Sequence, residues 1–397
     1  MSSFAEPAVP DTEEDWRAAW FDLDGATYLN FAAHSLLPRV AAAAVEQAVL
    51  AKAVPHRVPE SMFFDTADRA RRQLGTLLRA DPEDIALVTG AGAGAATVAT
   101  AIRWTPGDEV VFARGEFPLQ YATWQPLAAR HGLHIRQIDP AGRFVCAQDL
   151  IAALGERTRV VSISHVRFED GSLLDVEPLS AACRARGVVL ILDVSQSCGA
   201  LPISVSSLGA DVLICAGYKY LLGPWGTGFL WIRRGLLDQL GPAPFNWMAQ
   251  GLRPFSTLRY TDPQPAGGAM RFDAAEYTGP YNFNLAAWAA SLELVVRADP
   301  ARVWAHTTQL IDRLYAGLPQ PCVPMSPMNA SERGAFGCFA AGSLHSTSAL
   351  FQRLRPRGVI VALREGRIRV APHLCTSTDD IDRLLSIVHE WTKEGPS

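Results

Sequence analysis

The stretch from Val188 to Arg233 constrains the fold more than any other part of the chain. Three short apolar runs within it have the length and composition of strands buried on both faces: Val188–Leu192, Val212–Cys215 and Gly228–Ile232. Asp193 follows the first run, and Lys219 follows the second in a glycine-rich loop. Because ligands bind at the carboxyl edge of open α/β sheets, we expect this acid and this lysine to face one ligand.

The segments before this stretch alternate between strand-like and helix-like patterns. Within them we expect strands and helices at Glu109–Ala113, Leu119–His131, His134–Ile138, Ala147–Leu154, Arg159–Ser164 and Val176–Arg186. Strands separated by single helices predict a mostly parallel sheet with right-handed crossovers. Ser61 is expected to cap a helix that ends at Leu78. Residues 334–397 have the pattern strand, helix, strand, strand, helix, which indicates a small α+β unit.

The acid and the lysine suit a site for pyridoxal phosphate (PLP). A lysine amine can condense with the aldehyde of PLP, while a carboxylate keeps the pyridine nitrogen protonated. Lys219 and Asp193 are the candidates for these roles, and Gln196 is placed to hydrogen-bond the ring oxygen O3′. Taken singly, Asp193 could cap a turn and Lys219 could be a surface lysine. The apolar run before Lys219 and its neighbours Tyr218 and Tyr220 disfavour a surface lysine.

A family resemblance rests on these residues. The D-x-x-Q motif of Asp193 and Gln196, followed by G-Y-K-Y-L-L-G-P-W-G-T-G, resembles the class V aminotransferase family of fold-type-I PLP enzymes, which includes cysteine desulfurases, isopenicillin N epimerase and kynureninase. The resemblance runs from about Tyr28 to the C-terminal helix. It implies an α/β fold with a mostly parallel seven-stranded sheet in a large domain and a small α+β C-terminal domain. The implied boundaries are an N-terminal arm at 1–24 joining the small domain, the large domain at 25–292 and the small domain at 293–397.

A second glycine-rich turn follows the expected strand Ile85–Val88. The residues G-A-G-A-G-A-A-T open a helix that extends to about Ile102. Free backbone N–H groups and the helix dipole favour a phosphate at such a turn, although the glycine pattern alone is a weak indication. The resemblance assigns the PLP phosphate to this turn, with Gly92 and Ala93 at the usual positions. Because the family usually has threonine where Ala93 stands, backbone amides are expected to bind the phosphate here.

The resemblance implies further cofactor contacts. Phe117 takes the position of the aromatic residue that stacks on the PLP ring, with a packed core phenylalanine as the alternative. Phe168 stands where the family often has an asparagine near O3′. The segment 271–282 matches one whose hydroxyl reaches the phosphate of the neighbouring subunit, and Thr278 is the candidate there. With the proline-rich loop 242–268, this implies a homodimer with shared active sites.

The C-terminal motif G-R-I-R-V-A-P-H resembles the family strand whose arginine binds the substrate α-carboxylate. Arg369 aligns with that arginine, and a guanidinium can bind a carboxylate through two parallel hydrogen bonds. Arg367 lies on the same face of the strand, so one of the two could simply be solvated. Asn30, with the following backbone at Ala33 and the neighbouring His34, is expected to close over the same carboxylate.

The positions of the cysteines bear on the reaction. Cysteine desulfurases carry a nucleophilic cysteine on a loop before the final arginine strand, but residues 354–365 contain none. Cys338 lies too far upstream, and Cys375 lies beyond Arg369. We therefore expect a lyase of secondary metabolism, such as antibiotic biosynthesis, that cleaves a cysteine S-conjugate by β-elimination. The lincosamide-pathway PLP enzymes are one branch that it resembles. Tyr218, where the family commonly has histidine, is a candidate acid or base near Cα.

Other activities stay open at this point. Decarboxylation-coupled oxidative deamination, epimerisation and transamination are all compatible with the same cofactor. A catalytically silent PLP-fold binding protein is the alternative from another class. It is disfavoured because Asp193, Gln196, Lys219 and Arg369 all remain in place.

Composition excludes several classes of partner. The net charge of −4 gives no basic surplus for nucleic acid or an anionic membrane, and no apolar run reaches membrane-spanning length. The N-terminus lacks the basic and apolar regions of a secretory signal. The seven cysteines form no C-x-x-C pair, which disfavours a metal site and a disulfide framework. We expect a cytoplasmic enzyme with a small-molecule amino-acid substrate.

Overall fold

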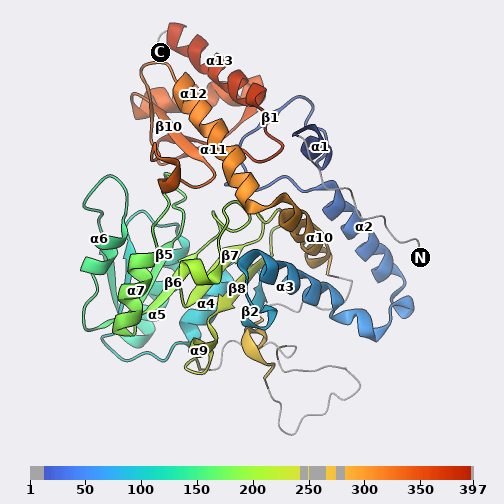
Figure 1. The fold of residues 1–397 in the computed structure, drawn as a ribbon, viewed down its shortest axis with the longest axis vertical. Coiled ribbons are helices and arrows are strands. Elements are labelled where there is room, and N and C mark those ends of the chain that lie inside the picture. Colours follow the sequence, from blue (N-terminus) through green and yellow to red (C-terminus); the bar gives the residue numbers. More distant parts are fainter. Residues whose placement is uncertain (1–12, 242–248, 250–264, 274–281, 395–397) are drawn as a thin grey trace.

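The computed structural model describes residues 13–241, 249, 265–273 and 282–394. Figure 1 shows a large body around a central sheet and a smaller body that contains the C-terminal helices. Among the described residues the central sheet has seven strands, in the order β2-β8-β7-β6-β5-β3-β4. Their bounds are β2 Ile85–Val88, β8 Gly228–Ile232, β7 Val212–Ala216, β6 Val189–Asp193, β5 Thr158–Ser164, β3 Glu109–Ala113 and β4 His134–Ile138. β8 runs antiparallel to β2 and to β7, and the remaining pairs are parallel, as the alternating pattern predicts.

Both faces of this sheet are buried, which explains the continuous apolar runs. Leu190 and Leu192 of β6 pack with the helices of one face, whereas Val189 and Ile191 pack with those of the other. The first face is covered by α3 (Asp65–Leu78), α6 (Ala147–Ala152), α7 (Glu177–Arg186) and α10 (Phe283–Ala298). The second is covered by α4 (Ala91–Ala101), α5 (Leu119–His131) and α9 (Arg234–Leu237). The short helix α8 (Val205–Leu208) lies between β6 and β7 in the chain.

The smaller body is a four-stranded antiparallel sheet covered by helices. Its described strands follow the order β12-β13-β10-β9, with bounds β12 Ala362–Arg364, β13 Arg367–Val370, β10 Gly337–Ala341 and β9 Cys322–Pro324. The helices are α11 (Pro300–Gly317), α12 (Leu344–Leu354) and α13 (Thr378–Glu394). Two features differ from the predicted pattern. β9 was not predicted, because a three-residue edge strand that ends in proline gives almost no periodic signal. β11 (Val359–Ile360) lies outside this sheet.

The N-terminal segment is joined to the smaller body. β1 (Thr27–Tyr28) pairs in parallel with β11, and Asn30 forms a bridge with Ala371. The strand β1 is short because β11 offers only two residues for pairing. In α1 (Glu13–Ala18), the Arg17 side chain donates to Ser377 at the start of α13. Helix α1 therefore lies beside α13.

One predicted helix start is wrong. We expected a helix capped by Ser61, but the residues after Pro59 form a separate 3-10 turn, Glu60–Phe63, and α3 begins at Asp65. The preceding helix is α2 (Arg39–Ala53). Among the described residues, no helix combines the length and apolar character needed to cross a membrane.

Candidate active site

Lys219 and Asp193 lie at one edge of the central sheet. Asp193 is the last residue of β6, and Lys219 follows β7, its parallel neighbour. Both are buried, with exposed fractions of 7% for Asp193 and 8% for Lys219. Asp193 Oδ1 accepts a hydrogen bond from the Ser195 amide at 2.8 Å, and the Ser195 hydroxyl accepts one from the Ala216 amide at 2.9 Å. These bonds tie the ends of β6 and β7 together and fix the carboxylate.

The Lys219 amine is surrounded by aromatic rings. Its Nζ lies 5.4 Å from the centroid of the Phe117 ring and 6.0 Å from that of Tyr218. Phe117 in turn meets Phe168 edge to face, with centroids 5.3 Å apart. Burial lowers the pKa of the Lys219 amine, although Asp193 opposes this shift. The structure thus brings four predicted site residues to one place and makes the amine easier to deprotonate than an ordinary lysine.

Tyr218 is held by a neighbour that the sequence did not single out. Its ring stacks on Trp225 with centroids 4.0 Å apart and an angle of 7° between the planes. The Tyr218 carbonyl accepts a hydrogen bond from the Ser35 amide at 2.9 Å, which attaches the N-terminal loop to the lysine loop. Burial raises the pKa of the Tyr218 phenol. The phenol therefore keeps its proton at neutral pH and can act as a donor or an acid rather than a base.

Gln196 connects the sheet edge to the same N-terminal loop. Its Nε2 donates to the Ala32 carbonyl at 2.9 Å, while its Oε1 is buried and has no hydrogen-bond partner among the described residues. Asn30 is also buried, and its Oδ1 has no partner there either. Ala33 is half-buried and His34 is exposed. Asn30 therefore offers an unused polar atom to a ligand, whereas His34 lies at the surface.

The two arginines of β13 have different partners. Arg367 donates from Nη1 to Glu169 Oε1 at 2.7 Å. Arg369 is only 2% exposed and donates from Nη1 to the Phe168 carbonyl at 2.9 Å, and its Nε has no partner among the described residues. Burial lowers the pKa of the Arg369 guanidinium. A buried cation with an unused donor is costly unless an anion joins it, which suits a carboxylate ligand.

The glycine-rich turn forms an anion cradle at the start of α4. Gly90 precedes the helix with φ of 154°, and Gly92 and Ala93 lie in the first turn, where backbone N–H groups have no helical acceptor. Gly228 of β8 packs against this turn, since an added Cβ would lie 2.7 Å from Gly90 Cα. Thr278, the other predicted phosphate contact, lies outside the described residues, as does most of the loop 242–268.

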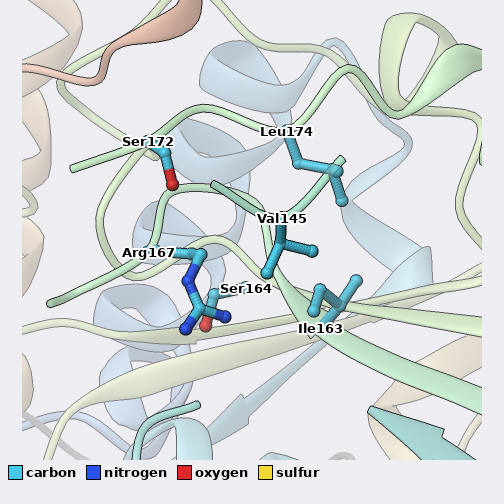
Figure 2. Close-up of a pocket in the computed structure, with 6 residues that line it drawn as sticks. All are labelled: Val145, Ile163, Ser164, Arg167, Ser172 and Leu174. Carbon is cyan, nitrogen blue, oxygen red and sulfur yellow. The ribbon is translucent and has the colours of Figure 1, made fainter. Parts of the chain in front are cut away.

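A buried ion pair is formed by the residues directly before Phe117 and Phe168. The Arg167 Nη1 donates to Glu116 Oε1 at 3.0 Å, and the Ser164 hydroxyl donates to Glu116 Oε2 at 2.5 Å. Burial raises the pKa of the Glu116 carboxyl. Figure 2 shows Arg167 and Ser164 beside a narrow gap that has no room for a water molecule. The gap is therefore a packing feature, and the ion pair joins the two residues that precede Phe117 and Phe168 in the chain.

The sequence analysis missed this ion pair and the Trp225 stack. Glu116 and Arg167 lie on separate strand–helix connections, so no local spacing marks them as partners. His165, next to Asp193 through a backbone hydrogen bond, is also buried, and its Nδ1 lies 2.9 Å from the Ser197 hydroxyl. Burial lowers the pKa of His165 to about 4, so it is neutral at physiological pH.

The residues present fit PLP. A buried lysine and a buried, oriented carboxylate lie at one sheet edge, and an anion cradle lies at the neighbouring helix start. Unpartnered buried atoms on Gln196 and Asn30 leave hydrogen-bonding capacity for bound groups. Lys219 would hold the aldehyde carbon, Asp193 the ring nitrogen, and the amides at Gly92 and Ala93 the phosphate.

Comparisons with known proteins agree with this assignment. The family model described as aminotransferase class-V matches residues 27–375. Isopenicillin N epimerase from Streptomyces clavuligerus is 26% identical over 344 residues, covering 82% of this chain and 84% of that protein. A solved lysine variant of C-DES, with glycine covalently linked to its PLP cofactor, superimposes with a TM-score of 0.81 at 26% identity, covering 92% of this chain and 97% of that one. C-DES, described as a cystine C–S lyase, has also been solved with its product cysteine persulfide, with a TM-score of 0.80, 26% identity and coverage of 92% and 98%. This chain therefore belongs to the class V aminotransferase family of fold-type-I enzymes, and its cofactor is PLP.

Proposed function

We propose that this enzyme is a C–S lyase that acts on an S-substituted cysteine of secondary metabolism and releases a thiol by β-elimination. The observation that carries the proposal is the burial of the thiols of Cys338 and Cys375, which keeps them protonated. Cys338, paired with Arg369 across β10 and β13, is fully buried, and its Sγ contacts the Glu169 carbonyl at 3.6 Å. Burial raises the pKa of Cys338 to about 12, and it does the same for Cys375. Such thiols stay protonated at neutral pH and are poor nucleophiles, so sulfur transfer to the enzyme is disfavoured.

The likeness to C-DES supports the same reaction class. C-DES is a cystine C–S lyase and matches this chain over 92% of its length at 26% identity. Cystine is itself a cysteine whose sulfur carries a substituent, so its chemical class matches the proposed substrate.

Each step of the β-elimination can be assigned to a residue of the site. PLP, when bound, supplies an electron sink conjugated with the substrate Cα. Arg369 binds the α-carboxylate and orients the substrate. Lys219, whose amine pKa is lowered by burial, takes the Cα proton. Tyr218 keeps its phenolic proton and donates it to the departing sulfur. With one water consumed, the products are a thiol, pyruvate and ammonia.

The test is to incubate the holoenzyme with a panel of S-substituted L-cysteines and to follow thiol, pyruvate and carbon dioxide. Equal amounts of thiol and pyruvate are expected. A matched Cys338→Ala variant should keep this activity, because the thiol takes no part. Carbon dioxide with an aldehyde product would show decarboxylation-coupled oxidative deamination instead. A loss of activity in Cys338→Ala with its fold intact would contradict the proposal.

Epimerisation is the second candidate, because isopenicillin N epimerase matches the chain over 82% of its length. An epimerase would invert Cα without releasing thiol. Incubation in deuterium oxide separates the two: inverted, deuterated amino acid without pyruvate supports the epimerase. A keto acid formed together with pyridoxamine phosphate would indicate an aminotransferase.

We further propose a homodimer with shared active sites. Asp273, the last described residue before the segment with Thr278, is anchored beside the cradle: its Oδ1 accepts from the Leu87 amide of β2 at 2.8 Å, and it pairs with Arg71. Asp273 therefore lies beside the strand that leads into the phosphate turn. Sedimentation of the holoenzyme tests the oligomeric state.

A further inference from the structure

A hairpin that follows β5 joins the large body to the smaller one. It spans residues 166–173, and its two end residues pair in an antiparallel bridge. Its backbone bonds to the segment between β9 and β10 of the smaller body: the Leu173 amide donates to the Glu332 carbonyl at 2.8 Å, and the Gly334 amide donates to the Gly171 carbonyl at 2.9 Å. The hairpin is therefore fixed against the smaller body as well as to the end of β5.

Both arginines of β13 bind this hairpin, at consecutive residues. Arg369 donates from Nη1 to the Phe168 carbonyl at 2.9 Å, and Arg367 donates from Nη1 to Glu169 Oε1 at 2.7 Å. The other carboxylate oxygen of Glu169 lies 3.6 Å from Arg167 Nη2. Because Phe168 and Glu169 share one peptide unit, the ion pair of Glu169 restrains the carbonyl that accepts from Arg369.

The direction of the Arg369 guanidinium decides how well it binds a carboxylate. Two parallel hydrogen bonds form only when the planar fork faces both oxygens. Arg369 is 2% exposed, and its Nε has no partner among the described residues, so it keeps a donor for a ligand. We propose that Arg367 and Glu169 are positioning residues, whose ion pair holds the Phe168 carbonyl so that Arg369 faces the substrate carboxylate. This inference rests on the proposed role of Arg369 in binding that carboxylate.

Two simpler roles of the Arg367–Glu169 pair give different results. If the pair only holds the two bodies together, its loss lowers stability and weakens all ligands alike. If Arg367 acts only through its charge, removing that charge weakens carboxylate binding, whereas removing the negative charge of Glu169 strengthens it. A positioning role predicts that both changes weaken carboxylate binding. The sign of the effect of Glu169 therefore separates positioning from attraction by charge.

The test uses the PLP-loaded enzyme and two probes, L-alanine and L-alaninamide. Both carry the same amine and side chain, but only L-alanine has a carboxylate. Binding is measured from the change in the absorbance band of the cofactor on titration. In Arg367→Met and in Glu169→Gln alike, we expect the affinity for L-alanine to fall about threefold or more, since members of one hydrogen-bond network couple by such amounts. The affinity for L-alaninamide should change less than about twofold.

Arg364→Met is the matched control. Arg364 lies directly opposite Arg367 in the β12–β13 ladder, so its side chain lies on the same face of the sheet and its loss removes the same charge. It is exposed, and its Nη1 donates to the Leu363 carbonyl at 2.8 Å. This variant should leave the preference for L-alanine over L-alaninamide within about twofold of wild type. The double variant Glu169→Gln/Arg367→Met should lose no more affinity for L-alanine than the weaker of the two single variants, because both changes break one interaction.

Glu169→Gln keeps the size of the side chain, so it decides the question even if Arg367→Met loosens the contact between the bodies. Tighter binding of L-alanine by Glu169→Gln would overturn the proposal. An unchanged ratio of the two affinities in both single variants, with or without lower thermal stability, would overturn it too.

Failure of the underlying assignments has its own signature. A wild-type enzyme that binds both probes equally would overturn the role of Arg369 together with this proposal. Absence of thiol and pyruvate from S-substituted cysteines would instead overturn the lyase proposal alone, because L-alanine has no sulfur to eliminate.

Discussion

Replacing Arg167 with methionine is expected to destabilise the enzyme, and the loss is expected to grow with pH. The Arg167 side chain is 8% exposed and that of Glu116 is 1% exposed, so the pair is cut off from water. Removing one partner of a buried ion pair costs about 3–5 kcal/mol, because the other charge is left uncompensated. Glu116 would keep its hydrogen bond from the Ser164 hydroxyl.

The pH dependence follows from the Glu116 carboxyl. Burial already raises its pKa in the folded state, and Arg167 opposes this shift. Without Arg167 the folded-state pKa lies further above the unfolded value of about 4.3. The folded state then binds more protons than the unfolded state above that pH. Stability therefore falls by as much as about 1.4 kcal/mol for each pH unit, until the folded-state pKa is passed.

Urea unfolding at pH 5.5 and pH 8 measures both effects. The free energy of unfolding of Arg167→Met should be closest to that of the wild type at pH 5.5 and clearly lower than it at pH 8. The double variant Glu116→Gln/Arg167→Met removes the unpaired carboxylate of Glu116. It should recover most of the unfolding free energy that Arg167→Met loses at pH 8. Arg114→Met, which breaks the exposed pair with Asp139, is the surface control and should change little. A loss that is the same at both pH values, and the same in the double variant, would refute this reasoning.

Three further results are expected. Borohydride reduction and peptide mapping should place a pyridoxyl group on Lys219, and a label on another lysine would rule out its assigned role. Asp193→Asn should fold and bind PLP yet lose nearly all turnover, because the ring nitrogen is no longer held protonated; near-normal turnover would contradict this. Mixed dimers of Lys219→Ala with a variant at Thr278 should regain part of the activity, whereas their failure to complement would count against shared sites.

The local elements of this fold were largely predictable. The strand Glu109–Ala113 and the helix Leu119–His131 have the predicted bounds, because periodicity and flanking residues such as Gly132 mark their ends. The sheet edge with Asp193 and Lys219 followed from two apolar runs, each ending near a charged residue. Here local pattern and tertiary structure agree.

Long-range partners were not predictable. The Glu116–Arg167 pair joins connections that follow different strands, and only the packed sheet brings them together. The Tyr220 ring stacks with that of His373, a contact that no spacing in the sequence marks. Arg367 and Arg369 lie on the same face of one strand, and the loop with Phe168 and Glu169 gives them different partners. Tertiary contacts, rather than spacing along the chain, set these roles.

The pairing of β1 with β11 has a consequence for synthesis on the ribosome. Thr27 can pair with Val359 only after Val359 has been synthesised, and Asn30 can form its bridge only after Ala371 has been synthesised. At about 5–20 residues per second, translation separates the two partners by roughly 15–70 seconds. The nascent large body can build its sheet during that interval, but its N-terminal loop has no strand to join. The carboxylate end of the active site therefore assembles only after nearly the whole chain has been made.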